Sequence, residues 1–387
     1  MTPGARVAAA IEILGEMAEG LAAEQALTRW ARRSRFAGSK DRAAIRDHVF
    51  DVLRCQRTAA HYGRGDSPRS LMIGLLYSQE ADLPTLFSGE GHAPAPLTLQ
   101  ESDFPAPPTD EATRWNMPDW LMPHMKDSLG ADAERVAMTL QNRAPVFLRV
   151  NTGKATRSEA MEMLSEEEVA TQVNSLCDTA LTVTEGARKI RNTSAFRNGV
   201  IELQDAASQA VVAALPPGGR AVDYCAGGGG KALALAADPA RDVYAHDIDP
   251  RRMADIPPRA ERADVAITLL STDDLQKTGP FDTVLCDAPC SGSGAWRRAA
   301  EGKWTLTEAR LSELTELQDA ILDQAATLLA AGGTLAYATC SVFRCENEDR
   351  IAAFLTRHPG WNCCYQRRFD IGPAGDGFFT AHLMRDL

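Results

Sequence analysis

From residue 200 onward, the sequence alternates short apolar stretches with helical or loop segments. The apolar stretches are AVDYCA, VYAHDI, AITLLS, FDTVLCDA and GTLAYATCS, each of a length typical of a buried strand. Strands that alternate with helices in this way form a mostly parallel sheet with helices on both of its faces. We therefore predict that residues 201–387 form a doubly wound, Rossmann-like α/β domain.

Two further domains are predicted before residue 201, because 387 residues exceed the size of most single hydrophobic cores. Residues 1–130 are expected to be all-α, since Val7, Ile11 and Leu14 recur at helical spacing, and to include a loop over about 88 to 118. The segment VFLRVN then alternates like a strand before what reads as a Ser-capped helix, RSEAMEMLSEEE. Residues 131–200 are therefore predicted to form a small α+β module.

The composition predicts an ordinary protein of the cytoplasm. No run of eighteen apolar residues is present, and Glu12 and Glu16 interrupt the apolar start in a way that a signal peptide would not tolerate. The nine cysteines are an odd number scattered through a long chain, so reduced thiols are expected. We expect a monomer that does not contact a membrane.

A net charge of −11 argues against non-specific coating of nucleic acid, so an RNA surface has to be a local basic patch. Residues 28–57 hold eight Arg and one Lys against three Asp, a local net charge of +6. Arg32, Arg33 and Arg35 are the candidates for RNA contact in this segment, and Arg149 is another. A solvated helix face with ion pairs explains the charges of the segment equally well.

The segment AVDYCAGGGGKALALAA places four glycines between a predicted strand and a helical run. In a doubly wound sheet, this turn lets a nucleotide-like ligand approach the backbone at the start of a helix. The run lacks the spacing of a P-loop, and Ala232 lacks the hydroxyl group that would bind magnesium. Taken alone, the glycine run therefore indicates the ligand class only weakly.

Acidic residues follow the next two predicted strands. Asp247 is expected to accept hydrogen bonds from ribose hydroxyls, and Asp249, before Pro250, to cap a helix. Asp273 is placed to meet an adenine amino group. A helix cap is the competing interpretation for Asp247 and Asp273.

Two cysteines, in DAPCSGSGAWRR and YATCSVFRCENED, each follow a predicted strand, at the edge where α/β sheets bind ligands. Cytosine C5 takes a methyl group only after a thiolate has added to C6, and the adduct then needs a base to remove the C5 proton. A carboxyl group beside the base, such as Asp287, can protonate or hydrogen-bond N3. A zinc site built from Cys286, Cys290, Cys340 and Cys345 is disfavoured, because the spacing is loose and no His accompanies them.

These residues resemble the RsmB group, also called Fmu or Sun, of bacterial RNA 5-methylcytosine methyltransferases. That family combines DxCAxxGGK, DAPCSGxGxxRR, YxTCSxxxxENE and a terminal DGFFxAxLxR, and all four occur here in this order. The upstream motifs QDxAS and LRVN are present at 204–208 and 148–151. The resemblance covers about residues 145 to 387.

The resemblance implies an S-adenosylmethionine-dependent enzyme. Cys340 would be the nucleophile, Cys290 would assist breakdown of the adduct, and Asp287 would contact both cofactor and cytosine. The residues that the resemblance assigns to the cofactor site are Cys225, Ala226, Gly227, Gly228, Gly229, Gly230, Lys231, Asp247, Asp273 and Asp287.

The segment KDRAAIRDHVFDVLR looks like part of the NusB-type RNA-binding domain of this family, which implies 16S ribosomal RNA as the substrate. The chain departs from the family at Gly228, where Pro is usual, at Ala232, where Thr or Ser is usual, and in the stretch AAEGKW. The first two departures predict a more flexible loop and a weaker cofactor affinity. The alternatives are an RNA-binding ribosome-assembly factor that has lost catalysis, or the same chemistry on transfer RNA or 23S ribosomal RNA.

Overall fold

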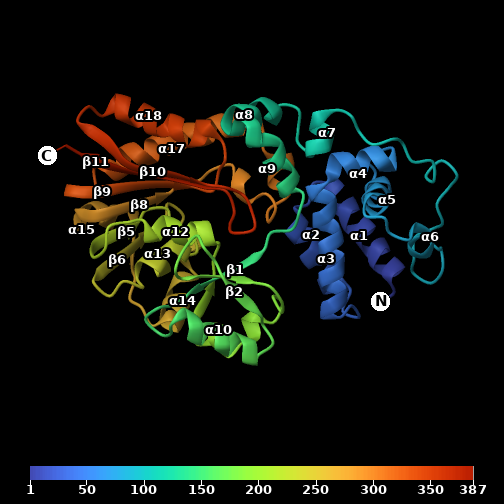
Figure 1. The fold of residues 1–387 in the computed structure, drawn as a ribbon, viewed down its shortest axis with the longest axis horizontal. Coiled ribbons are helices and arrows are strands. Elements are labelled where there is room, and N and C mark those ends of the chain that lie inside the picture. Colours follow the sequence, from blue (N-terminus) through green and yellow to red (C-terminus); the bar gives the residue numbers. More distant parts are fainter. Residues whose placement is uncertain (387) are drawn as a thin grey trace. The chain divides into compact units, whose positions relative to one another are not determined.

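The computed structural model describes residues 1–386, which divide into two compact units. The helical unit comprises Met1–Lys126, Gly130–Arg143 and Trp296–Thr305. The second unit comprises Asp127–Leu129, Ala144–Ala295 and Leu306–Leu387. Figure 1 shows the elements of each unit in sequence colours. None of the helices in residues 1–386 has the length and apolar character to cross a membrane.

Helices build the first unit, as the periodicity predicts. Thr2 and Ser67 cap the starts of α1 and α5, and in both helices a proline follows in the first turn. Ile13, Ile45 and Met72, from three different helices, are fully buried in one apolar core. The helices of this unit are α1 (Pro3–Ala18), α2 (Ala23–Arg33), α3 (Ser39–Arg54), α4 (Gln56–Gly63), α5 (Pro68–Ser78), α6 (Leu83–Leu86), α7 (Glu111–Trp115), α9 (Ala133–Leu140), most of α8 (Leu121–Leu129), η1 (Gly130–Asp132) and α16 (Gly302–Thr305).

The helical unit also contains Trp296–Thr305, a segment that the sequence analysis placed in the Rossmann-like domain. The indole of Trp304 donates to the carbonyl of Leu53 at 2.7 Å, and Lys303 Nζ donates to the carbonyl of Arg54 at 2.8 Å. Ala300 lies in the apolar core of this unit. Apolar periodicity could not show this, because the segment is short and its partners lie more than 200 residues away.

A four-stranded antiparallel sheet begins the second unit, with strand order β2-β3-β1-β4. Its strands are β1 (Val146–Val150), β2 (Thr171–Val173), β3 (Ala180–Val183) and β4 (Ile201–Leu203), accompanied by α10 (Arg157–Glu166), η2 (Ile190–Asn192) and α11 (Ser194–Arg197). The strand expected over 146–151 is confirmed. The expected Ser cap of α10 is wrong, because Thr156 caps this helix and forms a capping box with Glu159.

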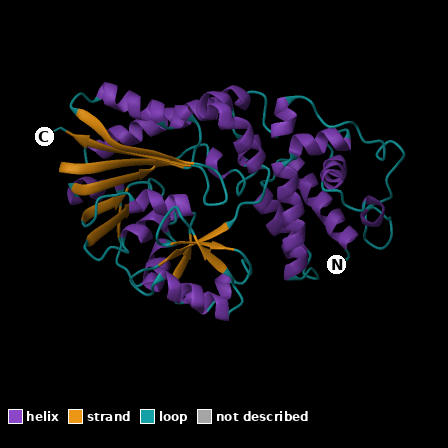
Figure 2. Cartoon of the chain, in the orientation of Figure 1, coloured by secondary structure: helices purple, strands orange, loops and turns teal. Residues whose placement is uncertain are grey.

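A seven-stranded sheet of order β10-β11-β9-β8-β5-β6-β7 forms the rest of the second unit (Figure 2). The five strands predicted from the apolar stretches are present and parallel. They are β5 (Gly219–Asp223), β6 (Arg241–His246), β7 (Thr268–Leu270), β8 (Phe281–Asp287) and β9 (Leu329–Thr339). The antiparallel strands β10 (Trp361–Phe369) and β11 (Phe378–Arg385), which were not predicted, complete the sheet.

Helices cover both faces of this sheet, which is the predicted architecture. Side chains of α17 (Glu308–Ala326) and α18 (Glu348–Arg357) share a core with one face. Those of α12 (Ala206–Ala213), α13 (Gly230–Leu235) and α14 (Ile256–Ala263) share a core with the other. The shorter helices are η3 (Pro250–Met253), α15 (Thr272–Thr278), η4 (Ser293–Ala295) and η5 (Arg344–Glu346).

The strand order reverses between β5 and β8. The chain runs from β5 through β6 to β7 and then returns to β8 on the other side of β5. Open α/β sheets bind ligands beside the carboxyl ends of their strands at such a switch point. The glycine run follows β5, and Asp287 ends β8.

Candidate functional site

The glycine run forms the turn between β5 and α13. Gly227 and Gly229 adopt φ angles of +48° and +79°, in the left-handed region that favours glycine. A Cβ atom on Gly229 would lie 2.6 Å from Ile256 Cγ1, so only glycine fits there. Gly228 has an ordinary φ, and its carbonyl accepts a hydrogen bond from Arg259 Nη1. Arg259 thus holds the loop at Gly228, the position where the family usually has Pro.

Asp247 lies buried at the end of β6 and faces this loop. Its carboxylate accepts hydrogen bonds from the backbone of Gly227 at 2.9 Å and of Asp249 at 3.0 Å, and Arg252 forms an ion pair with it at 3.1 Å. Asp249 caps η3, as expected, by accepting from the backbone N–H of Arg251. The Asp247 carboxylate therefore stands beside the glycine backbone, where a ribose would approach.

Asp273 lies exposed in the first turn of α15, beyond the end of β7. Ser271, and not Asp273, caps this helix. Ile248, which follows Asp247, is 81% exposed, an unusual placement for a large apolar side chain. No sequence pattern pointed to Ile248, although an apolar side chain beside the Asp247 carboxylate suits the face of a purine ring.

A partly buried ion pair joins the start of α13 to the end of β8. Lys231 Nζ lies 2.6 Å from Asp287 Oδ2, and the Lys231 side chain is almost fully buried. Burial acts to lower the pKa of Lys231, but the charges of Asp287, Asp223 and Cys340 outweigh it, so the pKa is raised. Lys231 is therefore a fixed positive charge between the glycine run, 227–230, and the two cysteine loops. We use this name for the loop after β8, which carries Cys290, and the loop after β9, which carries Cys340.

Asp223, at the end of β5, is a candidate site residue that was not predicted from the sequence. It is 1% exposed, and Oδ1 has no hydrogen-bond partner among residues 1–386. Burial, followed by the charge of Asp287, raises the pKa of Asp223 to about 7. Burial and the neighbouring carboxylates also raise the pKa of Cys225. The surroundings of Asp223 therefore favour a cationic group.

Cys290 and Cys340 meet at the carboxyl ends of β8 and β9. Their sulfur atoms lie 3.4 Å apart, and both side chains are partly buried. The contact with Cys340, then burial and the charges of Cys340 and Glu346, raise the pKa of Cys290 well above its usual range. The raised pKa favours the thiol form of Cys290, and either sulfur can be the donor in the contact between them.

None of the nine cysteines forms a disulfide. Cys286 is fully buried within β8. No group of three or more His, Cys, Asp or Glu side chains in residues 1–386 is arranged to hold a metal ion.

The residues present fit S-adenosylmethionine. The unpartnered oxygen of Asp223 and the acidic surroundings of Cys225 suit its ammonium and sulfonium charges. Asp247 and Ile248 lie where a nucleoside would extend along the sheet edge. The cysteine pair is connected to this region through Lys231 and Asp287.

Two family models match the chain. One, described as "16S rRNA methyltransferase RsmB/F", matches residues 210–383, and the other, an RsmF/B-like ferredoxin-like domain, matches residues 117–189. Ribosomal RNA small subunit methyltransferase B of Yersinia pestis bv. Antiqua (strain Angola) is 32% identical over 285 residues, which are 69% of this chain and 66% of that protein. The protein of the same name from Yersinia pseudotuberculosis serotype O:1b has the same identity and coverage. The chain thus matches just under two thirds of the length of these relatives.

Solved structures have the same fold. The crystal structure of PH0851 has a TM-score of 0.75 and 23% identity, and the match covers 100% of this chain and 99% of the other. A methyltransferase homologue from Pyrococcus horikoshii has a TM-score of 0.62 and 25% identity over 71% of this chain and 97% of its own. The cofactor site described above and these matches lead to one conclusion. Over residues 117–189 and 210–383 the chain matches the RsmB/F family of methyltransferases, and S-adenosylmethionine is the cofactor that this match supports.

Proposed function

We propose that this protein transfers a methyl group from S-adenosylmethionine to C5 of a cytosine in ribosomal RNA, most specifically 16S rRNA. Cys340 is the nucleophile, and Cys290 assists release. The observation that carries the proposal is the 3.4 Å contact between the two sulfurs beside the Lys231–Asp287 pair. The family models and the Yersinia relatives support ribosomal RNA as the substrate class.

The reaction begins when the Cys340 thiolate forms a bond to cytosine C6. The proton that the Cys340 thiol loses passes to the Asp287 carboxylate at the end of β8, and Asp287 then donates it to N3, which stabilises the charge that builds on the ring. Lys231 holds the Asp287 carboxylate in place. When bound, the cofactor supplies an electrophilic methyl group, and the activated C5 takes this group.

Release requires that C5 lose its proton and that the bond between Cys340 and C6 break. A water molecule takes the C5 proton, and N3 returns the proton that it gained. The Cys290 thiol donates a hydrogen bond to the departing Cys340 sulfur, a role that its retained proton allows. The target base must leave its stack to reach these groups, at a cost on the order of a few kcal/mol.

A fluorinated substrate tests this proposal. With RNA containing 5-fluorocytosine and S-adenosylmethionine, the protein should form a stable covalent complex, because fluorine at C5 blocks release. Cys340→Ala should form none, whereas Cys290→Ala should accumulate adduct on ordinary cytosine. Absence of adduct with the parent protein would favour the non-catalytic assembly factor. Bisulfite mapping of RNA from a deletion strain distinguishes 16S rRNA from 23S rRNA and transfer RNA.

A further inference from the structure

Glu346 carries a fully buried carboxylate between the two cysteine loops, and within residues 1–386 it forms no ion pair. Oε1 accepts hydrogen bonds from the backbone of Ser291 at 2.7 Å and from Gln318 Nε2 at 3.1 Å. Oε2 accepts from the hydroxyls of Ser291 and Ser341, each at 2.5 Å. A buried carboxylate with several hydrogen bonds is costly to disturb, since each lost partner leaves part of the charge unsolvated.

The two serines occupy equivalent positions, because each directly follows a cysteine of the pair. Ser291 follows Cys290, and Ser341 follows Cys340. One carboxylate therefore fixes the backbone on the carboxyl side of both thiols. Ser293 adds a second link, since its hydroxyl lies 2.9 Å from that of Ser341.

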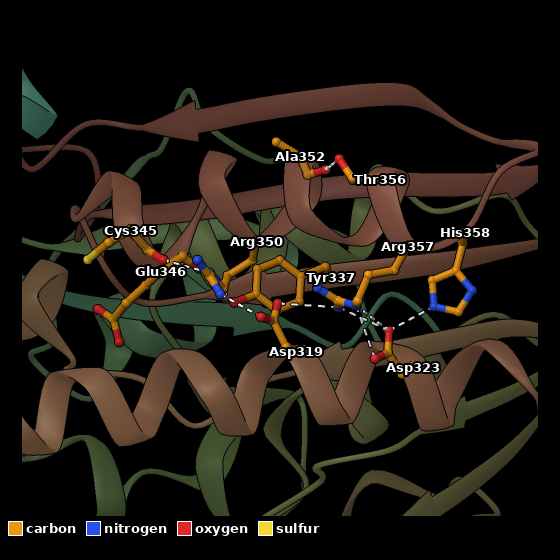
Figure 3. Close-up of polar contacts among 10 residues, drawn as sticks. All are labelled: Asp319, Asp323, Tyr337, Cys345, Glu346, Arg350, Ala352, Thr356, Arg357 and His358. Atoms are coloured by element: carbon orange, nitrogen blue, oxygen red, sulfur yellow. Dashed lines mark hydrogen bonds and ion pairs between the residues drawn. The ribbon is translucent and has the colours of Figure 1, made fainter.

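Glu346 is itself held in place by groups outside the cysteine loops. The hydroxyl of Tyr337, on β9, donates to the Glu346 carbonyl at 2.6 Å. Arg350 donates to the carbonyl of Cys345 at 2.8 Å and pairs with Asp319 of α17 at 2.6 Å. Figure 3 shows this network of α17 and α18, at one end of which Glu346 lies. These contacts fix the position of Glu346, so its carboxylate can hold both cysteine loops in place.

We infer that Glu346 is a positioning residue for the proposed reaction: it sets the separation of the Cys290 and Cys340 sulfurs by binding both loops at once. The catalytic part of this inference rests on the proposed function. Cys290 acts on Cys340 only within hydrogen-bond reach, and about 1 Å of misplacement can cost roughly 10²-fold in rate. The negative charge of Glu346 also contributes to the raised pKa of Cys290, after the contact with Cys340 and burial.

A cross-linking rate tests the positioning without RNA or cofactor. Diamide, a two-electron oxidant that takes up both thiol protons, should join Cys290 and Cys340 rapidly, and peptide mass spectrometry measures that disulfide. Glu346→Ala should slow the reaction by about tenfold or more, because the loops lose their common acceptor. Glu346→Gln keeps the shape of the side chain, so its cross-linking rate should lie between those of the parent and Glu346→Ala. Asp349→Asn is the matched control, since Asp349 is half-exposed and pairs with Arg344 outside the cysteine loops.

Catalysis gives the second readout. Glu346→Ala should lower kcat by about 10²-fold while the cofactor Kd and RNA Kd stay unchanged, and Glu346→Gln should restore part of kcat. Should Glu346→Ala fail to fold, Ser341→Ala removes only the link to the Cys340 loop and should slow cross-linking several-fold. An unchanged cross-linking rate in a folded Glu346 variant overturns the inference even if the parent protein forms the fluorocytosine adduct. Absence of that adduct overturns the proposed function and leaves the cross-linking test intact.

Discussion

Gly294 and Gly377 are in such close contact that a Cβ atom on Gly294 would lie 2.0 Å from the carbonyl oxygen of Gly377. The backbone of Gly377 donates to the Gly294 carbonyl at 3.0 Å, and the backbone of Gly294 donates to the Cys340 carbonyl at 2.9 Å. The C-terminal DGFF motif therefore supports the Cys340 loop through Gly294. This contact explains why a motif near the end of the chain accompanies the two cysteine motifs.

Gly294→Ala should disturb the cysteine loops directly. The added methyl group meets backbone, which cannot move aside, so we expect a loss of stability of about 1 to 3 kcal/mol and a larger loss of activity. Urea unfolding and methyl-transfer assays measure the two effects. Gly372→Ala is the control, because a Cβ atom there has nothing within 4 Å. Equal activity in both variants would contradict the proposed packing role.

Asp223→Asn should change how stability depends on pH. The pKa of Asp223 is raised from 3.8 to about 7 in the fold, so its stabilising contribution is present below pH 3.8 and is lost as pH rises to about 7. Asparagine mimics the protonated form, so the variant should gain stability over the parent from pH 4 to pH 8. The gain should reach on the order of a few kcal/mol. Urea unfolding without cofactor at pH 4, 6 and 8 measures this gain. A difference in unfolding free energy between variant and parent that is the same at all three pH values would contradict the prediction.

The local patterns that made the sheet predictable are those of its central strands. The stretch FDTVLCDA is mostly apolar, and its residues 283–286 are buried, because β8 lies between neighbouring strands on both sides. The cysteine motifs were placed correctly at strand ends for the same reason. Strand β10 was not predicted because it lies at the sheet edge, where the residues of its sequence WNCCYQRRF are mostly half-buried or exposed.

Long-range partners account for what the sequence could not show. Asp223 looks like an ordinary strand residue, and only the fold reveals that it is buried beside Asp287 and Lys231. Glu346 belongs to a recognised motif, but its four hydrogen bonds come from three separate segments of the chain. Spacing along the sequence carries no information on such contacts.

Arg259→Ala should weaken cofactor binding by roughly tenfold, the equivalent of one hydrogen bond to a charged group. Arg259 donates to the Gly228 carbonyl, so its loss frees the glycine loop. Isothermal titration with S-adenosylhomocysteine measures the affinity. Arg262→Ala is a matched control, since Arg262 shares the partner Glu202 at 2.7 Å without a hydrogen bond to the loop. If both variants lose the same affinity, the effect comes from Glu202 and not from Gly228.

Lys303→Met should remove a pH dependence from the helical unit. Burial lowers the pKa of Lys303 from 10.5 to about 7, so folding disfavours the charged form. The contribution of Lys303 to the free energy of unfolding therefore increases as pH rises from about 7 toward 10.5. The stability of the parent relative to Lys303→Met should therefore be greater at pH 9.5 than at pH 7. Thermal unfolding of both proteins at the two pH values measures the difference. A difference that does not vary with pH would show that Lys303 is charged in the fold.

The predicted RNA patch divides into two kinds of arginine. Arg33 forms ion pairs with Glu12 and Glu16, so Arg33→Glu should mainly destabilise the helical unit. Arg32 and Arg35 are exposed, and Arg32→Glu with Arg35→Glu should weaken RNA binding and reduce its salt dependence, because each phosphate contact releases counterions. RNA titrations at 50 and 200 mM salt measure both effects, with cofactor affinity as the control. An unchanged salt dependence would assign these charges to a solvated helix face, the interpretation that composition alone left open.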